Sequence, residues 1–236
     1  MAVSLADSFG LPAMQVHAGG GTVQRVYESL RKRIITLDLP PDTTLSRTDL
    51  TKTYGVSQTP IREALQLLKQ EGLVHIFPQS KTVVTRIDVP QTYEAHFLRV
   101  ALETEVCRRL AVEAGKDTLT RARSIIRMQE AVAEDSSQIA VFQELDEMFH
   151  QTLFAGLNRA GLHQLVRERS GHLERIRRLH LPEQGKVLNI LSGHRAILDG
   201  IASGDPDAAM AAIRDHLSQT VAKVEDLRQE FPQYFD

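Results

Sequence analysis

Hydrophobic residues recur at the 3.6-residue period of amphipathic helices along most of the chain, and short strand-like runs occur in one region only. The first part of the pattern predicts a helix over residues 22–37, two shorter helices between residues 46 and 72, and a β-hairpin with strands at 75–77 and 82–85. Beyond it the pattern predicts further helices at about 91–114, 117–133, 137–156, 159–180, 184–202 and 205–229. We therefore predict a mainly α protein, with a small helix-and-hairpin unit followed by an all-α helical bundle.

The two short helices carry clear start and stop signals. Ser46 is a good N-cap for the first, with Asp49 three residues later, and Gly55 supplies the left-handed residue that ends it. Ser57 caps the second helix, and Pro60 falls in its first turn, where the missing N–H does no harm. The pattern is a helix, a tight turn and a second helix.

The second of these helices has two faces of different character. Four apolar residues at helical spacing must be buried: Ile61, Ala64, Leu65 and Leu68. The opposite face is basic and rich in amides, so its donors can reach phosphates and base edges in a major groove. A small helical core with a solvated basic face is the plainer alternative. The residues that we predict to contact DNA are Arg47, Ser57, Gln58, Thr59, Arg62, Gln66 and, in the hairpin, Lys81.

The run GVSQTPIREAL, followed by EGLV and a short hairpin, resembles the winged helix-turn-helix of GntR-type transcription regulators over roughly residues 22–86. The resemblance implies that Arg62 reads guanine and that the hairpin, the wing, enters the minor groove. Gln58 stands where arginine is usual, and Lys81 stands where the wing tip usually has glycine. Because an amide side chain pairs best with adenine, Gln58 should favour adenine over guanine.

The balance of charged residues also differs between the predicted N-terminal unit and the rest of the chain. Residues 22–86 hold ten Lys/Arg and six Asp/Glu, a balance of +4, whereas residues 87–236 hold 18 and 23, a balance of −5. Only the first part is therefore suited to phosphate. The single cysteine, Cys107, suits a reducing cytoplasm, and no run of about 18 apolar residues predicts a membrane span. We expect a cytoplasmic protein without a secretion signal.

Four more motifs resemble the all-helical ligand-binding domain called FCD, which occurs in the FadR subgroup of these regulators. They are FLRVALE, DEMFH, GHRAILDGIASGD and IRDHL. The predicted organisation is a flexible tail at 1–21, a winged helix-turn-helix domain at 22–86, a linker at 87–91 and an all-helical metal-binding, effector-binding and dimerisation domain at 92–230.

Asp146, His150, His194 and His216 stand on helix faces that are otherwise apolar. Burying such groups without partners costs several kcal/mol each, so they must meet one another, water or a cation. One carboxylate and three imidazoles suit Zn²⁺ or Ni²⁺, although each histidine alone could be a hydrogen-bonded core residue. The FCD resemblance implies that these four positions hold a divalent metal ion.

Three other polar residues of this region raise separate expectations. Arg99 lies one turn from Glu103, and the resemblance places the matching arginine near the ligand, where a guanidinium can pair with a carboxylate. A surface Arg–Glu pair is the alternative. His172 and His180 lie in a strongly charged stretch, which predicts a solvated surface or the edge of a pocket.

Together these features favour a ligand-responsive transcription regulator, and a repressor in particular. We expect a homodimer that binds palindromic double-stranded operator DNA and whose helical domain binds a divalent metal and a small organic acid. One alternative is a repressor that senses the metal alone. The other is a metal-dependent hydrolase with an accessory DNA-binding module, which we do not favour because no suitable general base faces inward beside the metal ligands.

Overall fold

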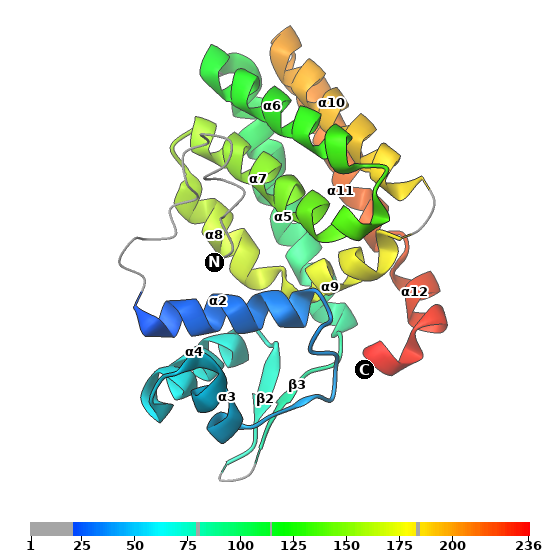
Figure 1. Cartoon of the computed structure of the whole chain (residues 1–236). Helices are drawn as coiled ribbons and strands as arrows, with labels where there is room; N and C mark the ends of the chain where they lie inside the picture. The colour runs from blue at the N-terminus through cyan, green and yellow to red at the C-terminus, as the bar shows by residue number, and fades with distance from the viewer. Residues whose placement is uncertain (1–20, 79–80, 114, 183–184) are drawn as a thin grey trace.

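The computed structural model describes residues 21–78, 81–113, 115–182 and 185–236 (Figure 1). Of the expected flexible tail, only Gly21 lies within the described residues. The N-terminal domain consists of three helices and a small sheet. Its elements are α2 (Thr22–Ile35), β1 (Thr44–Leu45), α3 (Arg47–Tyr54), α4 (Gln58–Gln70), β2 (Val74–Ile76) and β3 (Thr82–Val84).

The capping signals act largely as the sequence predicts. Ser46 accepts a hydrogen bond from the backbone N–H of Asp49, and Gly55 ends α3 with a φ of 63°. Ser57 occupies the N-cap of α4, but its side chain makes no capping hydrogen bond, so that part of the prediction is wrong. Strands β2 and β3 form the predicted hairpin, and β1, which the sequence pattern did not reveal, pairs antiparallel with the other edge of β3.

The C-terminal domain is an all-α bundle, as predicted. Its core is built from apolar residues of α5, α6, α7, α10 and α11, with α5 crossing behind α7 (Figure 1). No helix among the described residues is long and apolar enough to cross a bilayer. The helices are α5 (Val89–Glu113), α6 (Lys116–Val132), η1 (Ser136–Gln138), α7 (Ile139–Gly156), α8 (Ala160–Arg169), α9 (Gly171–His180), α10 (Lys186–Ser203), α11 (Pro206–Val221), α12 (Val224–Glu230) and η2 (Pro232–Tyr234).

Two predicted helices are each broken in two. The helix expected over 159–180 is interrupted at Ser170, and the one expected over 205–229 turns at residues 222–223. The break at Ser170 redirects the chain toward the N-terminal domain, where a Cβ on Gly171 would lie 2.8 Å from the Leu73 side chain. Periodicity missed both breaks because the apolar spacing continues through them.

The expected linker at 87–91 is shorter than predicted, because α5 already begins at Val89 and Pro90 sits in its first turn, where no N–H is needed. Ile87 is buried and pairs through its backbone with the C-terminal end of the chain: its N–H donates to the carbonyl of Tyr234 over 2.7 Å. The two domains are thus joined by a short, hydrogen-bonded segment.

A buried arginine ties the domains together. Arg31 of α2 is 3% exposed, and its Nε donates to Glu71, the C-cap of α4, over 2.8 Å. Its terminal nitrogens donate to Glu174 of α9 and to the backbone carbonyl of Arg167. Tyr27 donates to the same Glu71 carboxylate. The Arg31 guanidinium therefore donates hydrogen bonds to acceptors in both domains.

Replacing Arg31 by alanine should destabilise the protein by about 3–5 kcal/mol, because Glu71 and Glu174 would lose their buried counter-charge. Urea unfolding followed by circular dichroism measures the loss. The matched control is Lys32→Ala: Lys32 also reaches across the domains, to Glu144, but both side chains are largely exposed, so we expect less than about 1 kcal/mol. Equal losses in the two variants would contradict this account.

Candidate metal centre and DNA-contacting face

Four buried side chains converge in the core of the helical domain. Asp146 and His150 project one turn apart from α7, while His194 comes from α10 and His216 from α11. Each is exposed by 7% or less, and each offers a ligand atom within 4.8 Å of the others. A cation with bonds of about 2.0–2.2 Å could reach all four after small side-chain shifts.

Several polar atoms of this cluster have no hydrogen-bond partner within the part of the chain that the structure describes. They include Oδ1 of Asp146, Nε2 of His150, Nε2 of His194 and Nδ1 of His216. Orphaned buried polar atoms are costly, and here they are gathered at one point rather than scattered. The donor set therefore fits a divalent metal ion such as Zn²⁺ or Ni²⁺.

A second layer of side chains orients the four. Oε1 of Gln129 lies 2.9 Å from Nδ1 of His194, which leaves Nε2 of that ring facing the cluster, 3.4 Å from Oδ1 of Asp146. Phe149 stacks on the His194 ring with centroids 3.9 Å apart. Arg177 of α9 donates to Oδ2 of Asp146. This arrangement is typical of the outer shell of a metal site.

Sequence reasoning missed Gln129 and Arg177. Gln129 is fully buried on the inner face of α6, whose other buried residues are apolar. Its position at helical spacing from those apolar residues is the sequence signal that could have revealed it. Arg177 gave no comparable signal, because it lies in a stretch of charged residues that resembles a solvated surface.

The surrounding groups set the pKa values of the cluster residues. Burial would raise the pKa of Asp146, but Arg177 and then the imidazoles of His194 and His150 outweigh it and hold that pKa well below its usual range. Burial lowers the pKa of His194 to about 4, and burial together with the neighbouring imidazoles lowers that of His216 strongly. The core thus presents an ionised carboxylate beside at least two neutral imidazoles, which is the protonation state in which they bind metals.

Arg99, the predicted effector contact, is buried at 7% exposure and not on the surface. Its Nε donates to Oε1 of Glu103 over 2.7 Å, and the other oxygen of Glu103 lies 2.6 Å from Nδ1 of His150. Burial would raise the pKa of Glu103, but Arg99 and His150 hold it below its usual range. The alternative of a surface pair is therefore wrong, and Arg99 is connected to the cluster through Glu103.

The predicted DNA-contacting residues lie mostly on open surface. Gln58, Thr59, Arg62 and Gln66 are exposed on one side of α4, and the four apolar residues of its other side are buried. Ser57 is exposed at the start of the same helix, and Arg47 in α3 is half-buried. On the wing, Lys81 is exposed with its Nζ 5.6 Å from the centroid of the Phe77 ring. Gln79 and Ser80, which lie between Pro78 and Lys81 at the expected wing tip, are outside the described residues.

His172 and His180 are buried, so the expectation of a solvated setting is wrong. Nδ1 of His172 accepts a hydrogen bond from the backbone N–H of Asp88 over 3.0 Å, and a terminal nitrogen of Arg175 lies 2.8 Å from the same atom. Burial, reinforced by the Arg175 charge, lowers the pKa of His172 to about 3. The charged stretch is α9, whose polar side chains face other helices and the linker.

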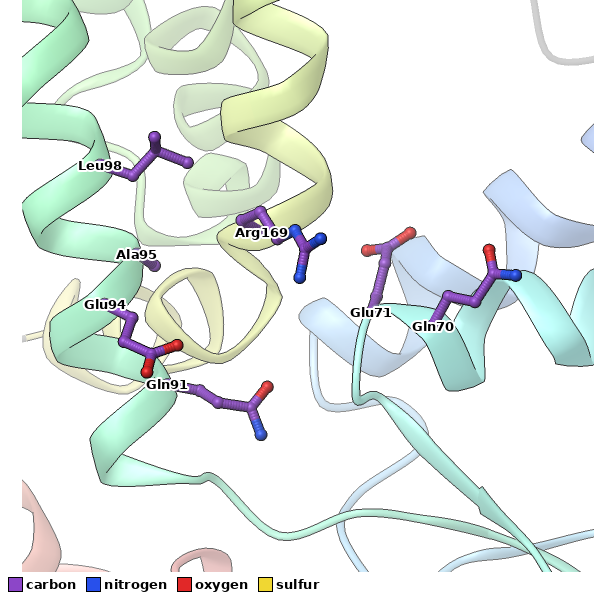
Figure 2. Close-up of a pocket in the computed structure, with 7 residues that line it drawn as sticks. All are labelled: Gln70, Glu71, Gln91, Glu94, Ala95, Leu98 and Arg169. Carbon is purple, nitrogen blue, oxygen red and sulfur yellow. The ribbon is translucent and has the colours of Figure 1, made fainter.

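A cleft of about 250 Å³ lies where α4 meets the helical domain. Figure 2 shows Arg169 extending from the end of α8 toward Glu71, with Gln91 of α5 pointing toward the same gap. None of its lining residues belongs to the metal cluster, so this is a separate feature of the domain junction. They are Gln70, Glu71, Gln91, Glu94, Ala95, Leu98 and Arg169.

Comparison with known proteins assigns both domains. Residues 22–84 match the gntR family of bacterial regulatory proteins, and residues 94–219 match the FCD domain. An HTH-type transcriptional regulator in an unstable DNA locus of Streptomyces ambofaciens is 35% identical over 210 residues, which cover 89% of this chain and 88% of the relative. The HTH-type transcriptional repressor RspR of Escherichia coli K12 is 28% identical, over 90% of this chain and 92% of the repressor.

Solved structures show the same fold. The E. coli protein McbR/YncC superposes with a TM-score of 0.75 at 15% identity, over 88% of this chain and 98% of that protein. A GntR-type regulator from Rhodococcus sp. RHA1 gives a TM-score of 0.69 at 21% identity, over 86% and 97% of the two chains. These likenesses confirm the predicted fold class, a winged helix-turn-helix followed by a helical FCD-type domain.

The depressed pKa of His172 predicts a specific pH dependence of stability. Below about pH 6.5 an unfolded histidine binds a proton that the folded protein excludes until about pH 3, so stability falls as the pH is lowered through this window. In His172→Gln this contribution should disappear. Urea unfolding of the chelator-treated protein between pH 7 and pH 4.5 should give a slope that is shallower by about 1.4 kcal/mol per pH unit at its lower end. An unchanged slope would show that His172 is not the buried neutral group described.

Proposed function

Because the chain belongs to the gntR family of bacterial regulatory proteins and carries an FCD domain, it is a transcription regulator and not an enzyme, and we propose that it is a metal-dependent, ligand-responsive repressor. We assign operator binding to residues 22–86, and metal binding, effector binding and dimerisation to residues 92–230. RspR, whose match covers 90% of this chain, is named a repressor, and this supports repression rather than activation.

Operator recognition rests on the exposed side of α4. Arg62 and Gln58 are exposed there, and their side chains are suited to guanine and adenine respectively. Two copies of the domain in a homodimer would place two such helices in successive major grooves of a palindromic site. Lys81 on the wing adds a positive charge near the backbone or the minor groove.

Metal binding rests on the single observation that one carboxylate and three imidazoles bring orphaned buried atoms to one point. A bound Zn²⁺ or Ni²⁺ would add positive charge to the core and could offer a coordination position to an effector. The effector class that fits is a small organic acid, because the guanidinium of Arg99 lies beside the Glu103–His150 pair and pairs well with carboxylates.

Replacing Arg62 by alanine should weaken binding to the preferred operator by about 1–3 kcal/mol and relax the preference at one base pair. Fluorescence anisotropy on duplexes selected from a random library, at two salt concentrations, measures both effects. Arg121→Ala is the matched control: Arg121 is an exposed arginine on α6, paired with Asp117 in the helical domain, and should leave operator affinity unchanged. Wild-type protein without any salt-sensitive preference for a duplex would overturn the proposed function.

Gly193→Ala should weaken Zn²⁺ binding at least tenfold, because a Cβ at this position would lie 2.6 Å from Nδ1 of His216 and must displace that ring. Competition with a chromophoric chelator measures the affinity. Gly161→Ala places the same methyl group on a helix where nothing lies within 4 Å, and we expect wild-type Zn²⁺ affinity. Equal affinities in all three proteins would remove His216 from the proposed ligand set.

A further inference from the structure

We propose that helix α9 couples the metal centre to the DNA-binding domain, with Arg177 as its contact to the metal ligand Asp146 and Glu174 as its contact to Arg31. The inference rests on the proposed metal function and names the regulation of that same site. The observations behind it are the contacts that the polar side chains of α9 make with the metal cluster and with the DNA-binding domain.

At the metal end, Arg177 binds one oxygen of Asp146 and leaves the other facing the His194 ring. It donates to Oδ2, while Oδ1 has no hydrogen-bond partner among the described residues and lies 3.4 Å from Nε2 of His194. A cation on Oδ1 would draw charge from the carboxylate that Arg177 also binds. The strength and geometry of the Arg177–Asp146 pair therefore depend on whether the cluster holds a metal.

At the other end, Glu174 lies three residues earlier on the same helix and reaches the DNA-binding domain. Its Oε2 lies 3.3 Å from a terminal nitrogen of Arg31 in α2. Arg31 in turn binds Glu71, the C-cap of α4, which is the helix that carries Arg62. Charged groups of alternating sign thus lead from a metal ligand to the end of the DNA-reading helix.

Further contacts tie α9 to the segment between the wing and the helical domain. Arg175 donates to the backbone carbonyls of Thr85 and Arg86, where the chain leaves the wing, over 2.6 and 3.3 Å. His172 accepts from the backbone N–H of Asp88 in the linker. A small shift of α9 would therefore be felt at α2 and at the exit from β3 together.

Another charged contact between the domains offers a competing route. Lys32 of α2 binds Glu144, which lies on α7 near Asp146, but the two side chains are 63% and 47% exposed. Exposed pairs transmit little because solvent screens them and both side chains are free to move. The Glu174–Arg31 contact, at 16% and 4%, is the better shielded route, and Glu144 supplies a matched control.

Hydrogen–deuterium exchange of the full chain, freed of metal by a chelator and measured with and without Zn²⁺, tests the proposal. In the wild type, Zn²⁺ should slow exchange in α7 and α9 and also in α2, residues 22–35. In Glu174→Gln the slowing should persist in α7 and α9 but fall at least threefold in α2, with Zn²⁺ affinity within twofold of wild type. Glu144→Gln should behave as the wild type. Glu174→Asp keeps the charge with a shorter reach and should give an intermediate α2 response. It takes the place of Glu174→Gln in the comparison if that variant folds poorly.

Three results would overturn the coupling through α9 while leaving the metal centre in place. The first is slowing at α7 and α9 of the wild type without any change in α2, and the second is an α2 response that is equal in wild type, Glu174→Gln and Glu174→Asp. Loss of the α2 response in Glu144→Gln but not in Glu174→Gln would assign the route to α7 and reject α9. No Zn²⁺-dependent change anywhere would instead refute the metal centre itself, and the coupling with it.

Discussion

The compensation of one buried carboxylate shapes much of the helical domain. Asp146 lies in a core where an unpaired negative charge would be prohibitively costly, so the helices around it must bring positive or polar groups. α10 and α11 bring imidazoles, and α9 brings the guanidinium of Arg177. The Asp146–Arg177 pair thereby gives one of the charges of α9 a partner in the core.

Features that depend on residues close together in the sequence could be predicted, whereas contacts between distant segments could not. The two faces of α4, the caps of α3 and the inward positions of the four cluster residues follow from local spacing, and the structure places them accordingly. Gln129, Arg177 and the Glu103–His150 contact join helices that are far apart along the chain, so no periodicity reports them. They become visible only once the bundle has formed.

The buried setting of α9 was missed for a related reason. A run of Glu, Arg and His is usually a solvated face, and that interpretation holds unless another domain covers it. Here the break at Ser170 turns the helix against α2 and the linker, and Arg31, Thr85 and Arg86 then supply partners for its charges. The composition of a charged segment therefore does not predict its burial, because burial depends on which other elements pack against it.

The backbone pairing between Ile87 and the last residues of the chain has a practical consequence. The N–H of Asp236 donates to the carbonyl of Ile87 over 3.3 Å, and Phe235 is buried beside it. Any sequence fused after Asp236 would therefore emerge next to the junction between the two domains. An affinity tag or reporter attached there sits where it can disturb their relative orientation.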